Sequence, residues 1–191
     1  DIPLVLKSFW PMGKEFAVCL THDVDEVRKT YQWITYPARC VRDRSLQRLH
    51  NQGISLFRKL TGTEPYWTFE NLMISEKKRG VRSTLFFLQE TGNVHLSDIK
   101  TWRHAGRRYR FTNPKIASLI HTLHDEGWEV GLHGSFHSYT SAELIKKEKE
   151  DLEAVLGSEI VGTRQHNLNL EIPGTWQIQA NAGITYDTTL G

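Results

Sequence analysis

The chain has 191 residues, of which 39% are hydrophobic and 24% charged, and its formal net charge is +2. This length and composition fit one globular domain with a sizeable core. The near-neutral net charge of the whole chain does not indicate binding to nucleic acid or to a membrane surface. No apolar run approaches the roughly 20 residues that span a bilayer. The two cysteines have no disulfide or metal-site spacing, which is compatible with the reducing cytoplasm that we expect as the location.

The first predicted strand is the apolar run FAVCL (16–20), in which Cys19 is expected to be a buried thiol. Residues 26–66 interrupt the pattern that follows. They carry many basic residues with aromatic residues between them, and they predict a basic, mostly helical insertion after the first strand.

Helices and strands then alternate along the chain. WTFENLMISEKKRG (67–80) predicts a helix with Phe69, Leu72 and Met73 on one face, and VRSTLFFL (81–88) predicts a buried strand. Alternation of this kind is typical of an α/β fold with a parallel sheet and covering helices. Further helices are predicted at 113–127 with Asn113 as the N-cap, at 140–157 with Thr140 and Glu143 as a capping box, and at 173–183, and further strands at 128–132, 159–163 and 184–189.

Reactive side chains follow these predicted strands. In parallel α/β barrels the carboxyl ends of the strands form the functional face, so residues that are distant in sequence converge there. This convergence is a stronger argument than any single motif. The residues are Asp23 and Asp25, His133 and His137, Arg164 and His166, and Asp187.

The segment WEVGLHGSFHSYT (128–140) holds two histidines four residues apart, His133 and His137. Neutral imidazoles are ligands for zinc and similar divalent ions, and a catalytic site commonly adds a carboxylate. An isolated HxxxH pair is weak evidence, and the alternative is two loop histidines bonded to backbone or solvent. The acidic and basic residues after other strands favour the metal site.

Asp23 and Asp25 point the same way in an extended chain, so one can bind a cation while the other acts as a base. The alternative is that one of them caps a helix. Arg164 can hold a catalytic carboxylate in place and keep it ionised, or form an ordinary structural ion pair.

Four segments in this order resemble the motifs of the NodB-homology polysaccharide deacetylases, carbohydrate esterase family 4. They are LTHDVDE, HGSFH, GTRQH and AGITYDTTLG. The resemblance spans residues 16–191 and implies a deformed (β/α) barrel that acts as a metal-dependent N-deacetylase of amino sugars. The reaction implied is attack of metal-activated water on an amide carbonyl.

By this resemblance Asp23 is the catalytic base, and Arg164 is the catalytic residue that orients it. The implied ligands of a divalent metal, for which zinc is the expected ion, are Asp25, His133 and His137. The spacing D-V-D departs from the family's adjacent aspartates, which leaves the division of roles between Asp23 and Asp25 open.

Two further departures concern the later motifs. His166 stands near the place where the third motif usually has proline, and it is expected to contact substrate; the alternative is that it only packs. The family's general acid is a late histidine, and no histidine follows His166. We therefore expect residues 1–191 to be a single deacetylase-like catalytic domain that lacks its C-terminal part. We also expect the chain to be a fragment of a longer protein that includes this part and the true start.

The segment 97–111 is strongly cationic and contains aromatic residues, among them Tyr109. Arginine suits phosphate and carboxylate, and aromatic rings stack on sugars. The segment is therefore a candidate for binding an anionic part of the substrate; the alternative is a solvated loop. The residues expected to bind substrate are His166, Arg107, Arg108, Trp102 and Tyr186.

The leading hypothesis is a hydrolase that removes an N-acetyl group from an amino sugar in a polysaccharide or a sugar-linked precursor. The alternatives are a deformylase or other amide hydrolase acting on a lipid-linked sugar, and a degenerate barrel that binds carbohydrate without hydrolysing it. The expected partner is an N-acetylated sugar or polysaccharide, with a lipid or phosphate linkage as a candidate. Peripheral membrane contact through the insertion is a looser hypothesis. No nucleic acid is expected.

Overall fold

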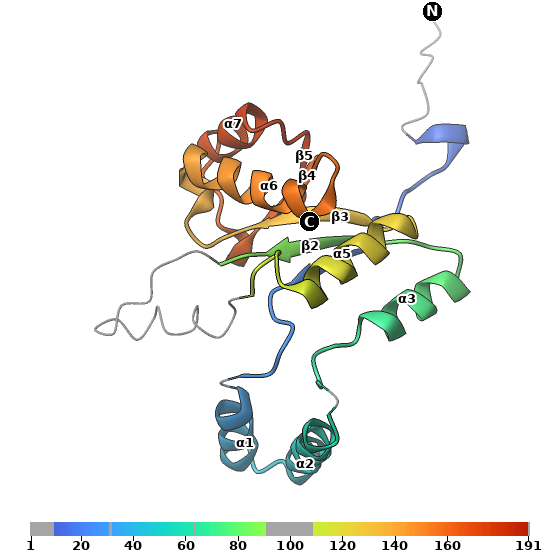
Figure 1. The fold of residues 1–191 in the computed structure, drawn as a ribbon, viewed down its shortest axis with the longest axis vertical. Coiled ribbons are helices and arrows are strands. Elements are labelled where there is room, and N and C mark those ends of the chain that lie inside the picture. The colour runs from blue at the N-terminus through green and yellow to red at the C-terminus, as the bar shows by residue number, and fades with distance from the viewer. Residues whose placement is uncertain (1–9, 31, 63, 91–108, 191) are drawn as a thin grey trace, which may run out of the picture.

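Five parallel strands form one sheet, in the order in which they occur along the chain (Figure 1). The computed structural model describes residues 10–30, 32–62, 64–90 and 109–190. Because the strands all run in the same direction, their carboxyl ends share one edge of the sheet. The strands are β1 (Thr21–Val24), β2 (Thr84–Leu88), β3 (Glu129–Gly134), β4 (Gly162–Gln165) and β5 (Tyr186–Asp187).

Helices connect the strands and cover the sheet. Helices α3, α5 and α6 contribute to one apolar cluster with β2 and β3, and α7 packs beside α6. The described helices are α1 (Gln32–Arg42), α2 (Leu46–Leu60), α3 (Phe69–Lys78), α5 (Pro114–Asp125), α6 (Ala142–Leu156) and α7 (Gly174–Asn181), with short 3-10 helices η1 (Pro11–Gly13), η2 (Ser138–Thr140) and η3 (His166–Leu168).

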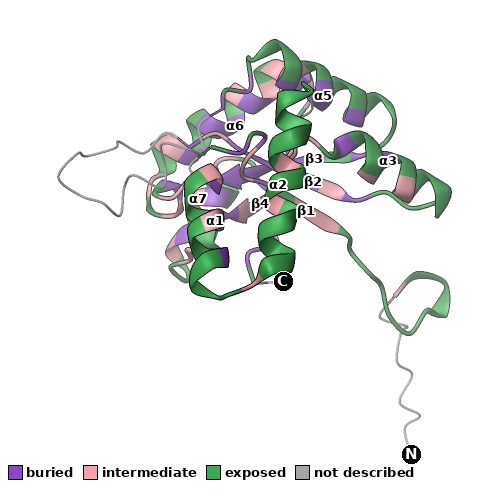
Figure 2. Ribbon diagram, turned by 90° about the horizontal axis from the view of Figure 1, so that it is seen from below, coloured by how far each residue is buried: buried purple, intermediate pink, exposed green. Residues whose placement is uncertain are grey.

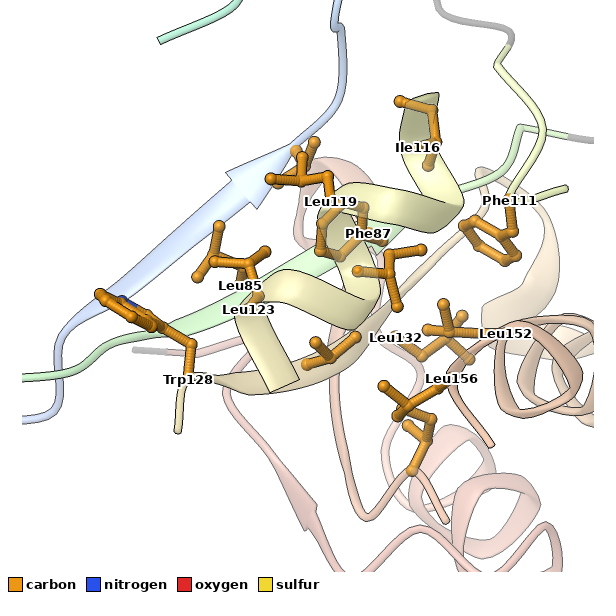
Figure 3. Close-up of a cluster of buried hydrophobic side chains, with 14 of the residues drawn as sticks. Leu85, Phe87, Phe111, Ile116, Leu119, Leu123, Trp128, Leu132, Leu152 and Leu156 are labelled. Atoms are coloured by element: carbon orange, nitrogen blue, oxygen red, sulfur yellow. The ribbon is translucent and has the colours of Figure 1, made fainter. Parts of the chain in front are cut away.

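The core lies between the sheet and these helices (Figure 3). Leu85 and Phe87 of β2 join it, while Phe86 and Leu88, which alternate with them, are equally inaccessible to solvent. Burial on both faces explains why this strand is a continuous apolar run. The helix α5 contributes the residues that its spacing predicts, namely Ile116, Leu119, Ile120 and Leu123.

The first strand lies later in the chain than the sequence predicts. The prediction of a strand at 16–20 is wrong, because pairing with β2 begins only at the residues that form β1. Residues 16–20 extend past the amino end of β2, where no described strand faces them, and Phe16 and Cys19 are exposed. As a consequence, Asp23 lies within a strand instead of following one.

The helix caps were predicted in part. Asn113 accepts a hydrogen bond from the backbone N–H of Lys115 at the start of α5, as expected. At the start of α6 the cap is Ser141 and not Thr140, so that prediction is wrong by one residue. Gly157 ends α6 with a φ of +78°, in the left-handed region that favours glycine.

One buried carboxylate, that of Glu76 on α3, joins the amino-terminal edge of the sheet. Its Oε2 accepts hydrogen bonds from Nε1 of Trp128 at 2.6 Å and from the backbone N–H and hydroxyl of Ser83 at 3.1 and 3.0 Å. Its Oε1 lies 3.0 Å from Nε2 of His22 on β1. Burial alone would raise the pKa of Glu76, but these hydrogen bonds and the imidazole outweigh burial and lower the pKa.

Helices α1 and α2 form a hairpin that stands apart from the sheet, between β1 and α3 (Figure 1). They fall within the segment that the sequence predicts to be a helical insertion. Figure 2 shows that most of the surface of both helices is exposed. Across the described ranges, no helix combines the length and the apolar content needed to cross a bilayer.

Candidate metal centre

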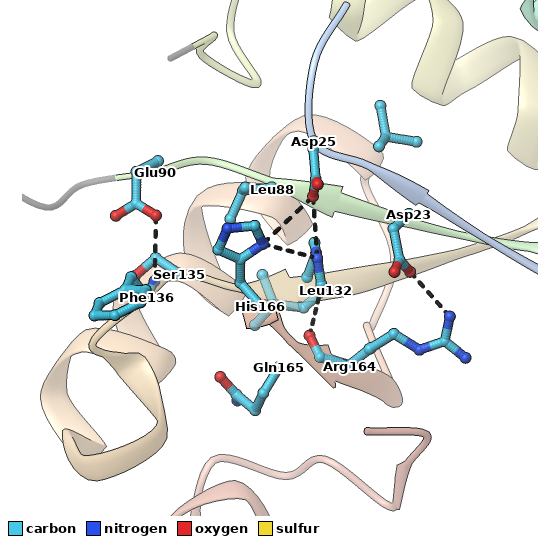
Figure 4. A network of polar contacts seen from close by, with 12 residues as sticks. Asp23, Asp25, Leu88, Glu90, Leu132, Ser135, Phe136, Arg164, Gln165 and His166 are labelled. Atoms are coloured by element: carbon cyan, nitrogen blue, oxygen red, sulfur yellow. Dashed lines mark hydrogen bonds and ion pairs between the residues drawn. The ribbon is translucent and has the colours of Figure 1, made fainter. Parts of the chain in front are cut away.

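The carboxyl ends of β1, β3 and β4 bring polar side chains to one edge of the sheet, and Figure 4 shows Asp23, Asp25, Arg164 and His166 among them. Asp23 lies in β1 and Asp25 follows that strand. His133 of β3 is paired in register with Arg164 of β4, and His166 begins the short helix after β4. The convergence expected from the sequence is therefore present for these five residues.

Asp25, His133 and His166 form a cluster in which all potential ligand atoms lie within 4.8 Å of one another. Oδ1 of Asp25 lies 3.1 Å from Nε2 of His133 and 3.5 Å from Nδ1 of His166. The two imidazole nitrogens are 3.3 Å apart, and both rings are buried. Two imidazoles and one carboxylate are a donor set typical of catalytic zinc sites.

The hydrogen bonding of His133 determines which of its nitrogens can bind a cation. Nδ1 lies 2.8 Å from the carbonyl oxygen of Arg164, and since a carbonyl only accepts, Nδ1 must carry a proton. In the neutral ring, Nε2 then directs a lone pair at Oδ1 of Asp25, which is buried and has no hydrogen-bond donor among the described residues. Facing lone pairs repel until a cation or a proton lies between them, so the cluster fits a divalent ion.

The charge state of Asp25 also suits a ligand. Burial alone would raise the pKa of Asp25, but the imidazoles of His133 and His166, when they carry the proton that faces this carboxylate, outweigh burial through hydrogen bonding and charge and hold that pKa below its usual range. The carboxylate is therefore ionised at neutral pH, as metal binding requires.

A second carboxylate, Asp23, lies beside the cluster and is held by Arg164. Nη1 of Arg164 donates to Oδ1 of Asp23 at 3.0 Å. The guanidinium is itself fixed, because its Nε donates to the backbone oxygen and hydroxyl of Thr188 at 3.2 and 3.1 Å. Its Cζ also lies 5.2 Å from the centroid of the Phe86 ring. The side chain of Asp23 remains 38% exposed, so an oriented carboxylate stays within reach of water.

Tyr109 fixes the strand ends next to the cluster. Its hydroxyl donates to the carbonyl oxygen of Val24 at 2.6 Å and accepts from the backbone N–H of Leu88 at 3.0 Å. The side chain is buried, so it does not serve as the exposed sugar-stacking ring for which the sequence made it a candidate. Burial raises the pKa of Tyr109, which keeps the hydroxyl protonated and able to donate.

His137 lies outside the cluster, although the sequence pairs it with His133. Its ring is exposed and packs edge to face against Phe136, with 4.9 Å between ring centroids. Residues four apart share a side in a regular helix or a regular strand, but here the chain leaves β3 after Gly134 and turns before η2, so neither regular geometry relates the two histidines. The buried carboxylates of Glu90 and Glu148 accept backbone N–H groups at the start of this turn.

His166 takes the position in the cluster that the sequence analysis gave to His137. It was expected to contact substrate, and its proximity to the other ligands was not foreseen. A signal was available, because His166 follows Arg164 by two residues and such residues project to the same side of an extended chain.

Tyr186 and Asp187, the other described residues of the predicted set, make their contacts away from the cluster. The hydroxyl of Tyr186 donates to Glu129 at 2.7 Å, and Glu129 begins β3, whereas His133 lies near its other end. The carboxylate of Asp187 accepts hydrogen bonds from α7 and from the backbone after β5. Trp102, Arg107 and Arg108 lie outside the described residues.

Comparison with known proteins gives a structural relationship. No family model and no curated protein match the chain. A crystal structure described as a "putative polysaccharide deacetylase from Mycobacterium smegmatis" matches 98% of this chain, with a TM-score of 0.56 and 20% sequence identity. The two proteins share a fold. The chain spans only 55% of that protein's length.

This relationship supports a polysaccharide-deacetylase-like α/β fold, as the four sequence motifs implied. At 20% identity the likeness concerns the arrangement of the backbone. Closure of the sheet into a barrel is not seen, because the described strand pairs run from β1 to β5 without a pair that joins these two. The chemistry therefore has to be argued from the cluster.

Proposed function

We propose that the chain is a metal-dependent hydrolase that removes an N-acetyl group from an amino sugar in a polysaccharide or a sugar-linked precursor. One observation carries the proposal: the Asp25, His133 and His166 cluster lies beside an oriented carboxylate, that of Asp23. A cation site next to a separately held base is the arrangement that metal-assisted amide hydrolysis requires. The deacetylase-like fold supports the same reaction class.

In this proposal the three clustered residues hold a divalent ion, and zinc is the expected one. When bound, the ion would polarise an amide carbonyl and lower the pKa of water. His133 is prepared for this role, since the carbonyl of Arg164 holds its ring in one tautomer and one orientation.

Asp23 is the proposed general base. Arg164 binds one oxygen of its carboxylate, and the other, Oδ2, has no partner in the described part of the chain, so it can accept a proton from the attacking water. Attack on the amide carbon gives a tetrahedral species whose nitrogen must be protonated before the amine leaves. In this proposal the protonated Asp23 returns that proton to the nitrogen.

Three further predictions from the sequence are part of this proposal. They are closure of the fold into a deformed (β/α) barrel, a cytoplasmic location, and recognition of an anionic linkage of the substrate by Arg107 and Arg108. A formyl and an acetyl group differ by one methyl group, so a deformylase would use the same residues. The activity assay therefore measures hydrolysis of N-acetylated and of N-formylated substrates separately.

Metal content tests the ligand set directly. Elemental mass spectrometry of the purified chain, loaded with zinc and desalted, is expected to show about one equivalent of zinc, as a three-ligand site binds one ion. His166→Ala should lose the ion, whereas His137→Ala should keep it because His137 is exposed outside the cluster. The reverse result would make His137 the ligand. Absence of metal from the loaded wild-type chain would leave an imidazole–carboxylate ion pair and end the proposal.

Activity of Asp23→Asn tests the base. The variant is expected to retain its zinc and to release amine from N-acetylated chito-oligosaccharides about 100-fold more slowly or worse, because amide nitrogen and oxygen cannot take up the proton. N-formylated oligosaccharides, assayed in parallel, decide the acyl group. An unchanged rate in Asp23→Asn would remove this residue from the reaction.

A further inference from the structure

Helix α2 exposes an apolar stripe to solvent. The stripe residues recur at helical spacing, and no residue of α2 is buried. Leu46, Phe57 and Leu60 are 82%, 67% and 77% exposed. A surface helix normally turns such a stripe toward the core, so this one has an unusual orientation. The α2 stripe consists of Leu46, Leu49, Leu56, Phe57 and Leu60.

The polar face of α2 is the face turned toward the protein. Gln52 and Ser55 are the half-buried residues of α2, and both accept hydrogen bonds from the amine of Lys29. Lys29 is buried, and its amine lies 4.0 Å from the centroid of the Trp33 ring on α1. These contacts fix the orientation of α2, with its polar face toward the protein and the α2 stripe on the opposite side.

The hairpin is also strongly basic. Helices α1 and α2 contain five basic residues and no acidic residue. Asp43 pairs with Arg42 and Arg48, and Lys59 pairs with an acidic residue after α2. Arg39 and Arg58 have no acidic partner in the described ranges. An apolar stripe on a helix with a basic polar face is the pattern of helices that lie in a lipid interface.

We propose that the α1–α2 hairpin docks on an anionic lipid surface. The α2 stripe would enter the boundary between headgroups and acyl chains, and the arginines of the hairpin would contact lipid phosphates. This inference does not depend on the metal cluster or on the reaction.

Charge favours a lipid surface over the main alternative occupant, a second copy of this chain. A two-fold interface would bring two copies of the same basic hairpin together. Like charges oppose that contact, whereas anionic headgroups complement them. Because neither α1 nor α2 has an acidic residue, charge favours an anionic lipid surface over a second copy of the chain as the partner of the α2 stripe.

Sedimentation with lipid vesicles tests the proposal on the full chain. Vesicles of phosphatidylcholine with phosphatidylglycerol are expected to bind it, and vesicles of phosphatidylcholine alone to bind it about tenfold more weakly or not at all. Leu56→Ser with Phe57→Ser should weaken binding to the anionic vesicles by about tenfold or more, because two large apolar side chains no longer leave water. Ile74→Ser on α3 is the matched control, since Ile74 is 64% exposed outside the hairpin.

Several outcomes would overturn the proposal. They are binding to neither vesicle, equal loss in the Ile74 control, and binding that disappears in high salt yet is unchanged in the stripe variant. A dimer that dissociates in the stripe variant, without vesicle binding, would assign the α2 stripe to a second copy. Circular dichroism confirms that each variant is folded. Zinc content, measured on the same samples, keeps this result separate from the fate of the proposed function.

Discussion

Arg164 contacts the two halves of the candidate site with different atoms. Its carbonyl oxygen accepts the hydrogen bond from His133, and its guanidinium donates to Asp23. The backbone of this residue therefore serves the cation ligands, while its side chain serves the proposed base. These two contributions can be separated by substitution.

Arg164→Lys keeps the backbone carbonyl and one positive charge but loses the planar, forked donor. We expect unchanged zinc content and hydrolysis that is slower by about tenfold or more, because the carboxylate of Asp23 is no longer held in one orientation. Zinc analysis and steady-state kinetics on the same preparation check this. A fall in kcat at constant KM would indicate a positioning role; loss of zinc would place the side chain within the ligand set.

Glu76→Gln is expected to destabilise the fold by about 1–3 kcal/mol at neutral pH, since an amide cannot accept all the hydrogen bonds that the carboxylate accepts. The folded-state pKa of Glu76 is lower than its ordinary value of 4.5. The stabilisation is therefore complete above 4.5 and is lost as the pH falls through the folded-state pKa.

Urea unfolding at several pH values measures this effect. The difference in unfolding free energy between wild type and Glu76→Gln should shrink as the pH falls below 4.5, the ordinary pKa value. Glu143→Gln, on the exposed side of α6, is the control and should show a small and nearly constant difference. A difference for Glu76→Gln that grows toward acid would contradict the sign of the pKa shift.

At the scale of single elements, local patterns predicted β2, β3, α5 and α6 well. Their apolar spacing, the Asn113 cap and the glycine after α6 act within a few residues, so they can be read from the sequence. The start of β1 could not be read in this way. FAVCL has the stronger strand composition, but the position of β2 decides which residues find a partner.

The candidate site was predictable to the level of strand ends and not to the level of ligands. The sequence predicted Asp25 and His133 as ligands because both come after predicted strands; in the structure Asp25 follows β1, and His133 lies near the carboxyl end of β3. The choice between His137 and His166 depends on the path of the turn after β3, which Glu90 and Glu148 hold from distant parts of the sequence. Spacing along the chain contains no information about such contacts.

Packing between neighbouring strands can be tested at Gly162 of β4. A Cβ atom there would lie 2.1 Å from Cζ of Tyr186 on β5. Gly162→Ala is therefore expected to destabilise the fold by about 1–3 kcal/mol. Gly174→Ala is the control, because its Cβ would meet nothing within 4 Å.

Denaturant unfolding of the single and double variants measures that contact. If the clash with the ring causes the loss, Gly162→Ala should cost less in a Tyr186→Ala background. The same cost in both backgrounds would point to backbone strain in β4 instead.

At the scale of the whole molecule, the sequence located the inserted hairpin without indicating its orientation. The amphipathic spacing in α2 is clear, and the ordinary expectation is that the apolar side faces the core. Lys29, which precedes α1, reverses that expectation by binding the polar side. The buried amine of Lys29, which lies before α1, thus holds α2 so that its apolar side faces solvent.

The two edges of the sheet are held by different sets of residues. At the amino edge, Glu76 joins α3 to β1 and to the residues just before β2 and β3. At the carboxyl edge, Asp23, Asp25 and their partners contact mainly one another. The half-exposed carboxylate of Asp23 at the carboxyl edge can therefore be substituted without touching the contacts of Glu76, which leaves this position open to the design of other chemistry on the same scaffold.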